Sequence, residues 1–135
     1  MWKHVAAGVL LFSGVAAAAP SAVEIELNKL EPVDGACRAY MIFRNQSESN
    51  FASYRLDLVM FGKDGVLAKR IVVEAAPLPA TKTSLKQFDI QGLACPDLGQ
   101  VLLNDVTACR DQGGEKADCA ATVKLQSKGD VQFVK

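Results

Sequence analysis

The amino-acid sequence predicts an all-β protein: an antiparallel β-sandwich of about seven strands, held by two disulfides. Apolar and polar residues alternate over short segments, which is the pattern of strands with one buried face. Turn-forming Gly, Pro and Asp residues separate these segments at regular intervals, and no long segment shows a helical period. A closed β-barrel is the competing architecture for the same pattern.

Several short segments have strand character. They are residues 23–30, 37–45, 54–61, 66–73, 81–90, 99–108, 120–127 and 131–134. In the first, Glu24 and Glu26 form an acidic row, which we expect on the exposed face of an edge strand that ends at Pro32. In the third, we expect Arg55 and Asp57 to face solvent, because apolar residues occupy the alternate positions.

Turn-forming residues separate these predicted strands. The segment 62–65, Gly-Lys-Asp-Gly, favours left-handed conformations and predicts a hairpin. Residues 77–80 contain two prolines and form a connector, and residues 92–98 are long enough for one helical turn. Residues 99–108 and 120–127 flank a polar loop, so we expect them to form a second hairpin.

The N-terminus has the organisation of a cleavable export signal. A basic pair at residues 3–4 precedes an apolar stretch at residues 5–15 and small residues at 16–19. The stretch is shorter than the ~20 apolar residues of a membrane span. The predicted domains are therefore a signal peptide, residues 1–18, and one β-sandwich domain, residues 19–135. The absence of twin arginines favours Sec export to the periplasm or beyond, without membrane insertion after cleavage.

The charge of the mature chain excludes some partners. Without Lys3, the 15 Lys and Arg residues fall to 14, against 15 Asp and Glu. A net charge near zero with no basic cluster does not favour nucleic acid binding, which requires grouped Lys and Arg. The same absence argues against binding to an anionic membrane surface.

Four cysteines, Cys37, Cys95, Cys109 and Cys119, remain after signal cleavage. None forms the close Cys-x-x-Cys pair of zinc or redox sites, so we expect structural disulfides. Four cysteines allow three connectivities. We favour Cys109–Cys119, which closes a short polar loop, with Cys37–Cys95 as the long-range link.

Signal cleavage also removes the only histidine, His4. The mature chain then has no Ser-His-Asp or Cys-His site and no His metal ligand, so we expect no catalytic residues, no metal and no cofactor. Serine–lysine neighbours are interpreted as surface residues; they are Ser84 with Lys86, and Ser127 with Lys128. Carboxylates beside apolar strands are interpreted as solvent-facing or as caps of strand ends; they are Asp57, Asp89 and Asp105.

Two further motifs have structural interpretations. Residues 111–118 contain three acidic side chains, but their spacing does not match a calcium-binding loop, which favours a polar loop closed by a disulfide. Asn45, Gln46 and Ser47 match the N-glycosylation pattern, and we expect Asn45 to be unmodified.

The second strand carries the candidate binding residues Arg38, Tyr40 and Arg44, which share one face with Ile42. Tyr and Arg are enriched at protein–protein interfaces. The alternative interpretation is an exposed sheet face, on which long side chains cover apolar area with their stems. Aromatic residues lie nearby if the neighbouring segments pair; they are Phe51, Tyr54 and Phe61.

Residues 37–90 resemble FxLYD-type immunoglobulin-like bacterial domains. The resemblance rests on the Asn45-x-Ser47 bend, the Phe61-Gly-Lys-Asp-Gly65 turn and the bend at residues 77–83. The mature chain, with its GACRAYMIF and GLACPDLGQVLLNDVTAC segments, is also similar to small α-proteobacterial periplasmic proteins that are often labelled as Tat-pathway signal-sequence proteins. These resemblances imply an Ig-like sandwich and no particular activity.

Three functional hypotheses follow. The first is a non-enzymatic periplasmic binding or accessory module, which recognises a protein or envelope component through Arg38, Tyr40, Arg44 and the adjoining loop 46–53. The second is an inhibitor of a periplasmic protease or lysozyme, which inserts the Cys109–Cys119 loop into an active site. The third is an enzyme that uses carboxylates alone.

Overall fold

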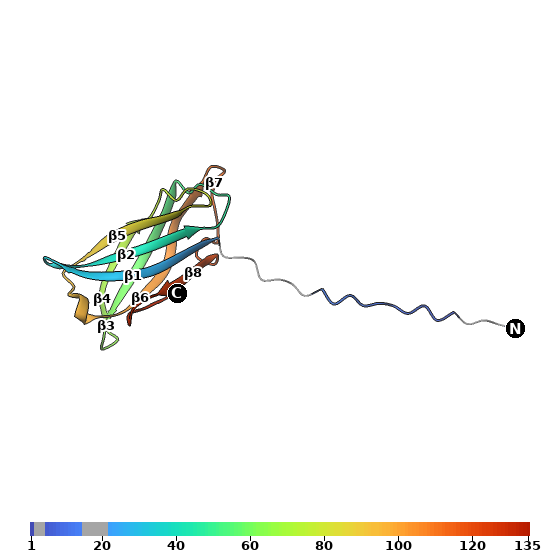
Figure 1. Cartoon of the computed structure of the whole chain (residues 1–135), viewed down its shortest axis with the longest axis horizontal. Helices are drawn as coiled ribbons and strands as arrows, with labels where there is room; N and C mark the ends of the chain where they lie inside the picture. Colours follow the sequence, from blue (N-terminus) through green and yellow to red (C-terminus); the bar gives the residue numbers. More distant parts are fainter. Residues whose placement is uncertain (2–4, 15–21) are drawn as a thin grey trace.

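Two β-sheets form the two layers of the molecule. The computed structural model describes residues 1, 5–14 and 22–135. In Figure 1, β5, β2 and β1 cross in front of β3, β4 and β6. The described residues form nine strands and one short 3-10 helix, η1 (Cys95–Asp97), at the predicted helical turn. This confirms the all-β class and the sandwich architecture with two packed layers.

The first sheet has the strand order β5-β2-β1-β8. Its strands are β1 (Val23–Val33), β2 (Ala36–Asn45), β5 (Thr83–Gln91) and β8 (Val123–Ser127). β1 lies inside this sheet and continues through Pro32, which faces Cys37 of β2, until Gly35 reverses the chain at φ 71°. The predicted edge strand ending at Pro32 is therefore wrong. A proline close to the end of a strand removes little from the ladder of hydrogen bonds.

The second sheet has the order β4-β3-β6-β7, with β9 also paired to β6. Its strands are β3 (Ser53–Gly62), β4 (Leu67–Glu74), β6 (Leu98–Asp111), β7 (Gly114–Glu115) and β9 (Gln132–Val134). The predicted hairpin is confirmed, since β3 and β4 pair antiparallel. At the turn, the Gly65 amide donates to the Gly62 carbonyl at 3.0 Å, and Gly65 adopts φ 80°.

The predicted second hairpin is wrong. β6 and β8 belong to different sheets, and β8 pairs in parallel with β1. The chain then crosses back, and β9 pairs in parallel with β6. β8 and β9 contact each other, and the Ser127 hydroxyl donates to the Val131 carbonyl between them. One side of the sandwich is thus closed by this crossing, while β4 and β5 are the last strands of their sheets on the opposite side.

The core lies between the inner faces of the two sheets. Its buried side chains include Ile25, Met41 and Phe43 from the first sheet and Leu56, Leu58, Met60, Val101 and Leu103 from the second. Phe51 and Tyr54 also belong to this core, with their rings packed edge to face at a centroid distance of 5.0 Å. The aromatic residues are expected near Tyr40 only if the neighbouring segments pair, and this condition is not met, because β2 and β3 lie in different sheets.

Both predicted disulfides are confirmed. Cys37–Cys95 links β2 to η1 across a sequence separation of 58 residues. Cys109–Cys119 links the end of β6 to the turn before β8 across 10 residues. Each disulfide therefore fastens an irregular segment to a strand.

The structure describes part of the predicted signal peptide. Residues 5–14 are exposed and form neither helix nor strand. The basic pair at residues 3–4 and the small residues at 16–19 lie outside the described residues. Within the part of the chain that the structure describes, no helix has the length and apolar character of a membrane span.

Candidate functional site

The three predicted binding residues lie on the outer face of the first sheet. β2 alternates strictly, so that Ala39, Met41 and Phe43 enter the core while the residues between them point outward. Arg38, Tyr40, Ile42 and Arg44 are therefore half-buried on one surface, together with their neighbours on β1 and β5. We call this surface the β2 face.

Arg38 is bound to the adjacent edge strand. Its Nε donates to Oδ1 of Asp89 at 2.7 Å, and its Nη2 donates to Oδ2 at 3.1 Å. This two-pronged contact stabilises both charged forms, so the pKa of Arg38 is raised and that of Asp89 is lowered. Arg38 is thus held flat along the sheet, and Asp89 is an ion-pair partner instead of a strand cap.

Tyr40 is held by residues of β1. Its hydroxyl donates to Oε1 of Glu31 at 3.2 Å, and Nζ of Lys29 lies 5.7 Å from the ring centroid. Lys29 and Glu31 also form an ion pair at 3.3 Å. On its other side, Tyr40 has Gln87 of β5 as its partner in the register.

Arg44 joins an acidic cluster at the other end of the β2 face. Its Nη1 lies 3.2 Å from Oε1 of Glu24 and 3.8 Å from Oε1 of Glu26. Glu26 is buried, which corrects the predicted exposed acidic row. A hydrogen bond from Asn28 lowers the pKa of Glu26, and Arg44 and Lys128 add to this effect against the opposing influence of burial.

An apolar centre lies between these charged groups. Ile42 faces Leu85 of β5 across the strand pair, and Leu85 has 61% of its surface exposed. Tyr40 occupies the next outward position on β2. Hollows lie elsewhere on the described surface, for example beside Leu27 and Val131 and beside Pro32 and Pro96. Sequence alternation placed Ile42 here, but Leu85 was missed because the pairing of β5 with β2 is non-local.

A second polar region lies where three connecting segments meet at one end of the sandwich. Asn45 is buried at its centre, and its Nδ2 donates to the carbonyls of Ser49, Leu78 and Pro79. Its Oδ1 accepts from the amide and hydroxyl of Ser47. The Asn45-x-Ser47 motif is thus a structural bend, in which every polar atom of the Asn45 side chain is engaged.

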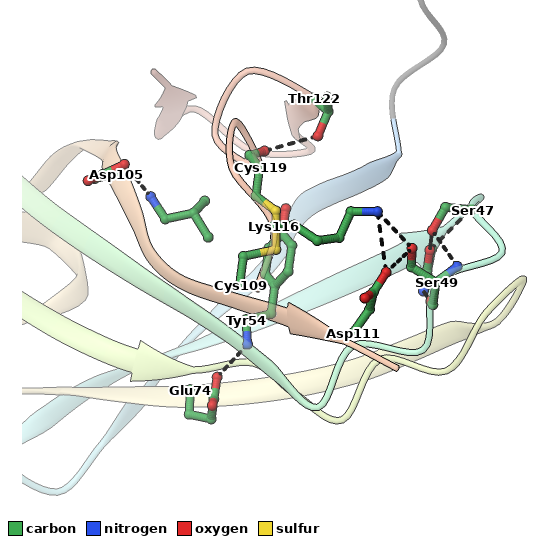
Figure 2. Close-up of a disulfide and its surroundings, with 12 residues drawn as sticks. Ser47, Ser49, Tyr54, Glu74, Asp105, Cys109, Asp111, Lys116, Cys119 and Thr122 are labelled. Carbon is green, nitrogen blue, oxygen red and sulfur yellow. Dashed lines mark hydrogen bonds and ion pairs between the residues drawn. A yellow bond between two sulfur atoms is a disulfide. The ribbon is translucent and has the colours of Figure 1, made fainter. Parts of the chain in front are cut away.

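The Cys109–Cys119 loop packs against the loop 46–53. Figure 2 shows the Ser49 hydroxyl directed at Asp111, to which it donates at 2.8 Å. Lys116 lies 3.3 Å from the same carboxylate oxygen, and Gln112 bonds the backbone of residues 48 and 50. The Ser49 bond is the largest cause that lowers the pKa of Asp111, and the Gly113 amide and Lys116 add to this effect. Residues 112–113 and 115–118 of the loop remain exposed.

The lysines of the predicted serine–lysine neighbours bond other groups. Lys86 donates to the Pro77 carbonyl, and Lys128 forms an ion pair with Glu26 at 3.7 Å. A serine–lysine contact that the sequence did not indicate joins Ser49 and Lys116 at 3.3 Å. The Lys116 Nζ also lies 3.3 Å from the Asp111 carboxylate. Among the described residues, no group of three or more His, Cys, Asp or Glu side chains is arranged to hold a metal ion.

Asp57 is buried, which corrects the expectation that it faces solvent. It lies in β3 with only 2% of its surface exposed. Arg70 of β4 donates to both carboxylate oxygens at 2.9 and 2.8 Å, and Asn104 of β6 donates to Oδ2 at 2.8 Å. These bonds lower its pKa to about 2, against the effect of burial. General acids at neutral pH require a raised pKa, so Asp57 is suited to a structural role.

Tyr54 carries a buried hydroxyl beside the second disulfide. Figure 2 shows its ring directed toward the Cys109–Cys119 bond. Among the described residues, its Oη has no hydrogen-bond partner, and burial raises the pKa of this phenol. A buried hydroxyl without a partner has lost its hydrogen bonds to water without replacement.

We expect Tyr54→Phe to raise the free energy of unfolding by about 1 kcal/mol, because it removes an unsatisfied polar atom and keeps the ring. Urea denaturation of the oxidised protein measures this change. Tyr40→Phe is the matched control and is expected to lower stability slightly, since the Tyr40 hydroxyl donates to Glu31. A less stable Tyr54→Phe variant would show that the hydroxyl has a partner.

Comparison of the chain with protein-family models, with curated proteins and with solved structures found no match. The resemblances noted from sequence motifs therefore stay predictions. Functional inference for this protein rests on the geometry of its own residues.

Proposed function

We propose that the protein is an exported, non-enzymatic binding module that recognises another protein through the β2 face. The observation that carries this proposal is the apolar centre formed by exposed Leu85 with half-buried Tyr40 and Ile42, within a surface otherwise occupied by ion-paired charges. An apolar centre surrounded by a polar rim is the organisation of a protein–protein binding site.

The ion pairs around the apolar centre support the proposal. Arg38 is held by Asp89, and Arg44 is held by Glu24, so neither side chain has to be ordered when a partner binds. Side chains that are already fixed reduce the entropy cost of association. The face therefore combines an apolar contact area with a rigid frame.

The compartment is proposed from the cysteines. All four are paired within the described residues, and such disulfides persist in oxidising compartments outside the cytoplasm. Together with the N-terminal export pattern, this favours the periplasm or the cell exterior as the place where the partner is found.

We expect Leu85→Ser to reduce partner capture by about tenfold or more, which is typical of truncating an apolar side chain at the centre of an interface. The measurement is crosslinking in the native envelope followed by quantitative mass spectrometry. Leu85 is a cleaner probe than Tyr40, because Tyr40→Ala also removes the contacts with Glu31 and Lys29.

The matched control is Val66→Ser. Val66 is 63% exposed in the turn between β3 and β4, and lies in the other sheet's hairpin. It should capture the partner as the wild type does, and both variants should keep the wild-type melting temperature. Equal capture by the Leu85→Ser variant and the wild type would refute the β2 face as the binding surface. Equal loss in both variants would also refute it.

A further inference from the structure

We propose that two copies of the chain associate through the free edge of β4, in an antiparallel pairing with Val72 on the two-fold axis. β4 is the last strand of its sheet, and β3 is its partner on one edge only. Its other edge has no paired strand among the described residues. Such an edge presents N–H and C=O groups that another strand is able to bond.

The side chains of β4 suit an additional strand. Val72 is 55% exposed on the outer surface, and the inward-facing Ile71 and Val73 are only half-buried at the open side of the sandwich. A second strand beside β4 covers all three. β-Branched residues in succession also favour strand pairing, because they pack well on a pleated surface.

The charges of β4 favour its own copy as the added strand. A two-fold axis makes the contact self-complementary. With Val72 on that axis, Arg70 lies opposite Glu74 of the second copy, and Ile71 lies opposite Val73. Within one chain, Arg70 donates to Asp57, and the Glu74 carboxylate accepts from the Ser53 hydroxyl and the Tyr54 amide. Both side chains are still exposed on the outer surface, so their attraction across the axis adds to these contacts.

The free edge of β5 lacks such a pair of opposite charges at symmetric positions. β5 contains one basic residue, Lys86, and one acidic residue, Asp89. They lie on opposite faces of the strand, so they never stand directly opposite each other in a symmetric antiparallel pair. Lys86 points between the sheets and donates to the Pro77 carbonyl. Inward-pointing lysines are a known means of blocking strand edges.

Lys69 limits the pairing of β4. Its Nζ lies near Gly92, which follows β5, so Lys69 also points toward the first sheet. In the proposed register it lies opposite Ala75 of the second copy, where the strand has ended. The pairing therefore covers Arg70 to Glu74. The opposite side of the sandwich is closed by β8 and β9, so this contact gives a dimer and not a fibre.

Sedimentation velocity of the oxidised protein tests the dimer. We expect the wild type to shift from monomer to dimer as its concentration rises from micromolar to millimolar. Val72→Lys should remain monomeric, because it places two positive charges at the axis, and its melting temperature under dilute conditions should be unchanged. Val66→Lys, a substitution of a similarly exposed residue in the turn between β3 and β4, should dimerise as the wild type does.

Crosslinking tests the register. No described cysteine is free, so Val72→Cys introduces the single thiol needed for a covalent dimer across the axis. Residues directly opposite in an antiparallel pair lie within disulfide reach. We expect V72C to oxidise to dimer much faster than L85C. A wild type that stays monomeric throughout, a Val72→Lys variant that still dimerises, or equal oxidation of V72C and L85C would overturn the proposal.

Discussion

Asp57→Asn is expected to lower the free energy of unfolding by about 2 kcal/mol at neutral pH. The folded-state pKa of Asp57 is about 2, against 3.8 for an unperturbed group, and each unit of difference corresponds to about 1.4 kcal/mol. Asparagine keeps the shape of the side chain but loses the charge that accepts bonds from Arg70 and Asn104. Urea denaturation monitored by circular dichroism measures the difference.

The Asp57 carboxylate also makes the free energy of unfolding depend on pH. The folded pKa of Asp57 lies below its unfolded value, so its contribution is fully present above about pH 4 and is lost as the pH falls through about 2. The stability difference between wild type and Asp57→Asn should therefore shrink over this window. A difference that stays constant would show that the carboxylate charge is not the cause.

Asp105→Asn is the matched control. Asp105 stands opposite Asp57 in the register of β3 and β6, but it is exposed and accepts only the amide of Val106. Exposed substitutions of this kind usually change stability by less than about 0.5 kcal/mol. An equal loss in both variants would contradict the role assigned to the burial of Asp57.

Replacing both Cys37 and Cys95 with serine should destabilise the protein by about 4 kcal/mol. The equivalent change at Cys109 and Cys119 should cost about 3 kcal/mol, because a shorter closed loop restricts the unfolded chain less. The sequence separations are 58 and 10 residues. Both variants replace two sulfurs in the same chemical way, so each is the control for the other.

Guanidinium denaturation of the two double variants measures this difference. The variant that lacks Cys37–Cys95 should unfold at the lower denaturant concentration. If the variant that lacks Cys109–Cys119 unfolds at the lower concentration instead, this disulfide contributes more to stability than its loop length accounts for. The contacts of the loop 111–118 with residues 46–50 would then depend on it.

Local patterns predicted the elements well. The alternation of β2 separated Arg38, Tyr40 and Arg44 from the core residues between them. Gly65 in the β3–β4 turn adopts the positive φ that its sequence favours. The cysteine pairing also followed from spacing, because one pair closes a short polar loop and leaves the other two cysteines as partners.

Non-local contacts decided what local patterns missed. Glu26 and Asp57 both lie at outward positions, yet both are buried. Alternation tells which face a residue occupies, but it does not tell whether long side chains on neighbouring strands cover it. Arg70 covers Asp57, and Arg44 and Lys128 lie against Glu26. The candidate binding centre needed the same kind of information, since Leu85 reaches Ile42 only through the pairing of β5 with β2.

By itself, the sequence determined the all-β class, the positions of most strands, both disulfides and the face on which Arg38, Tyr40 and Arg44 lie. These properties depend on residues close together in the chain or on the simple pairing of four cysteines. Only the tertiary structure decided that β8 lies beside β1, that β1 is an interior strand and that β4 and β5 are left as free edges. Strand order joins segments far apart in the sequence, and a pattern with a period of two residues holds no information about it.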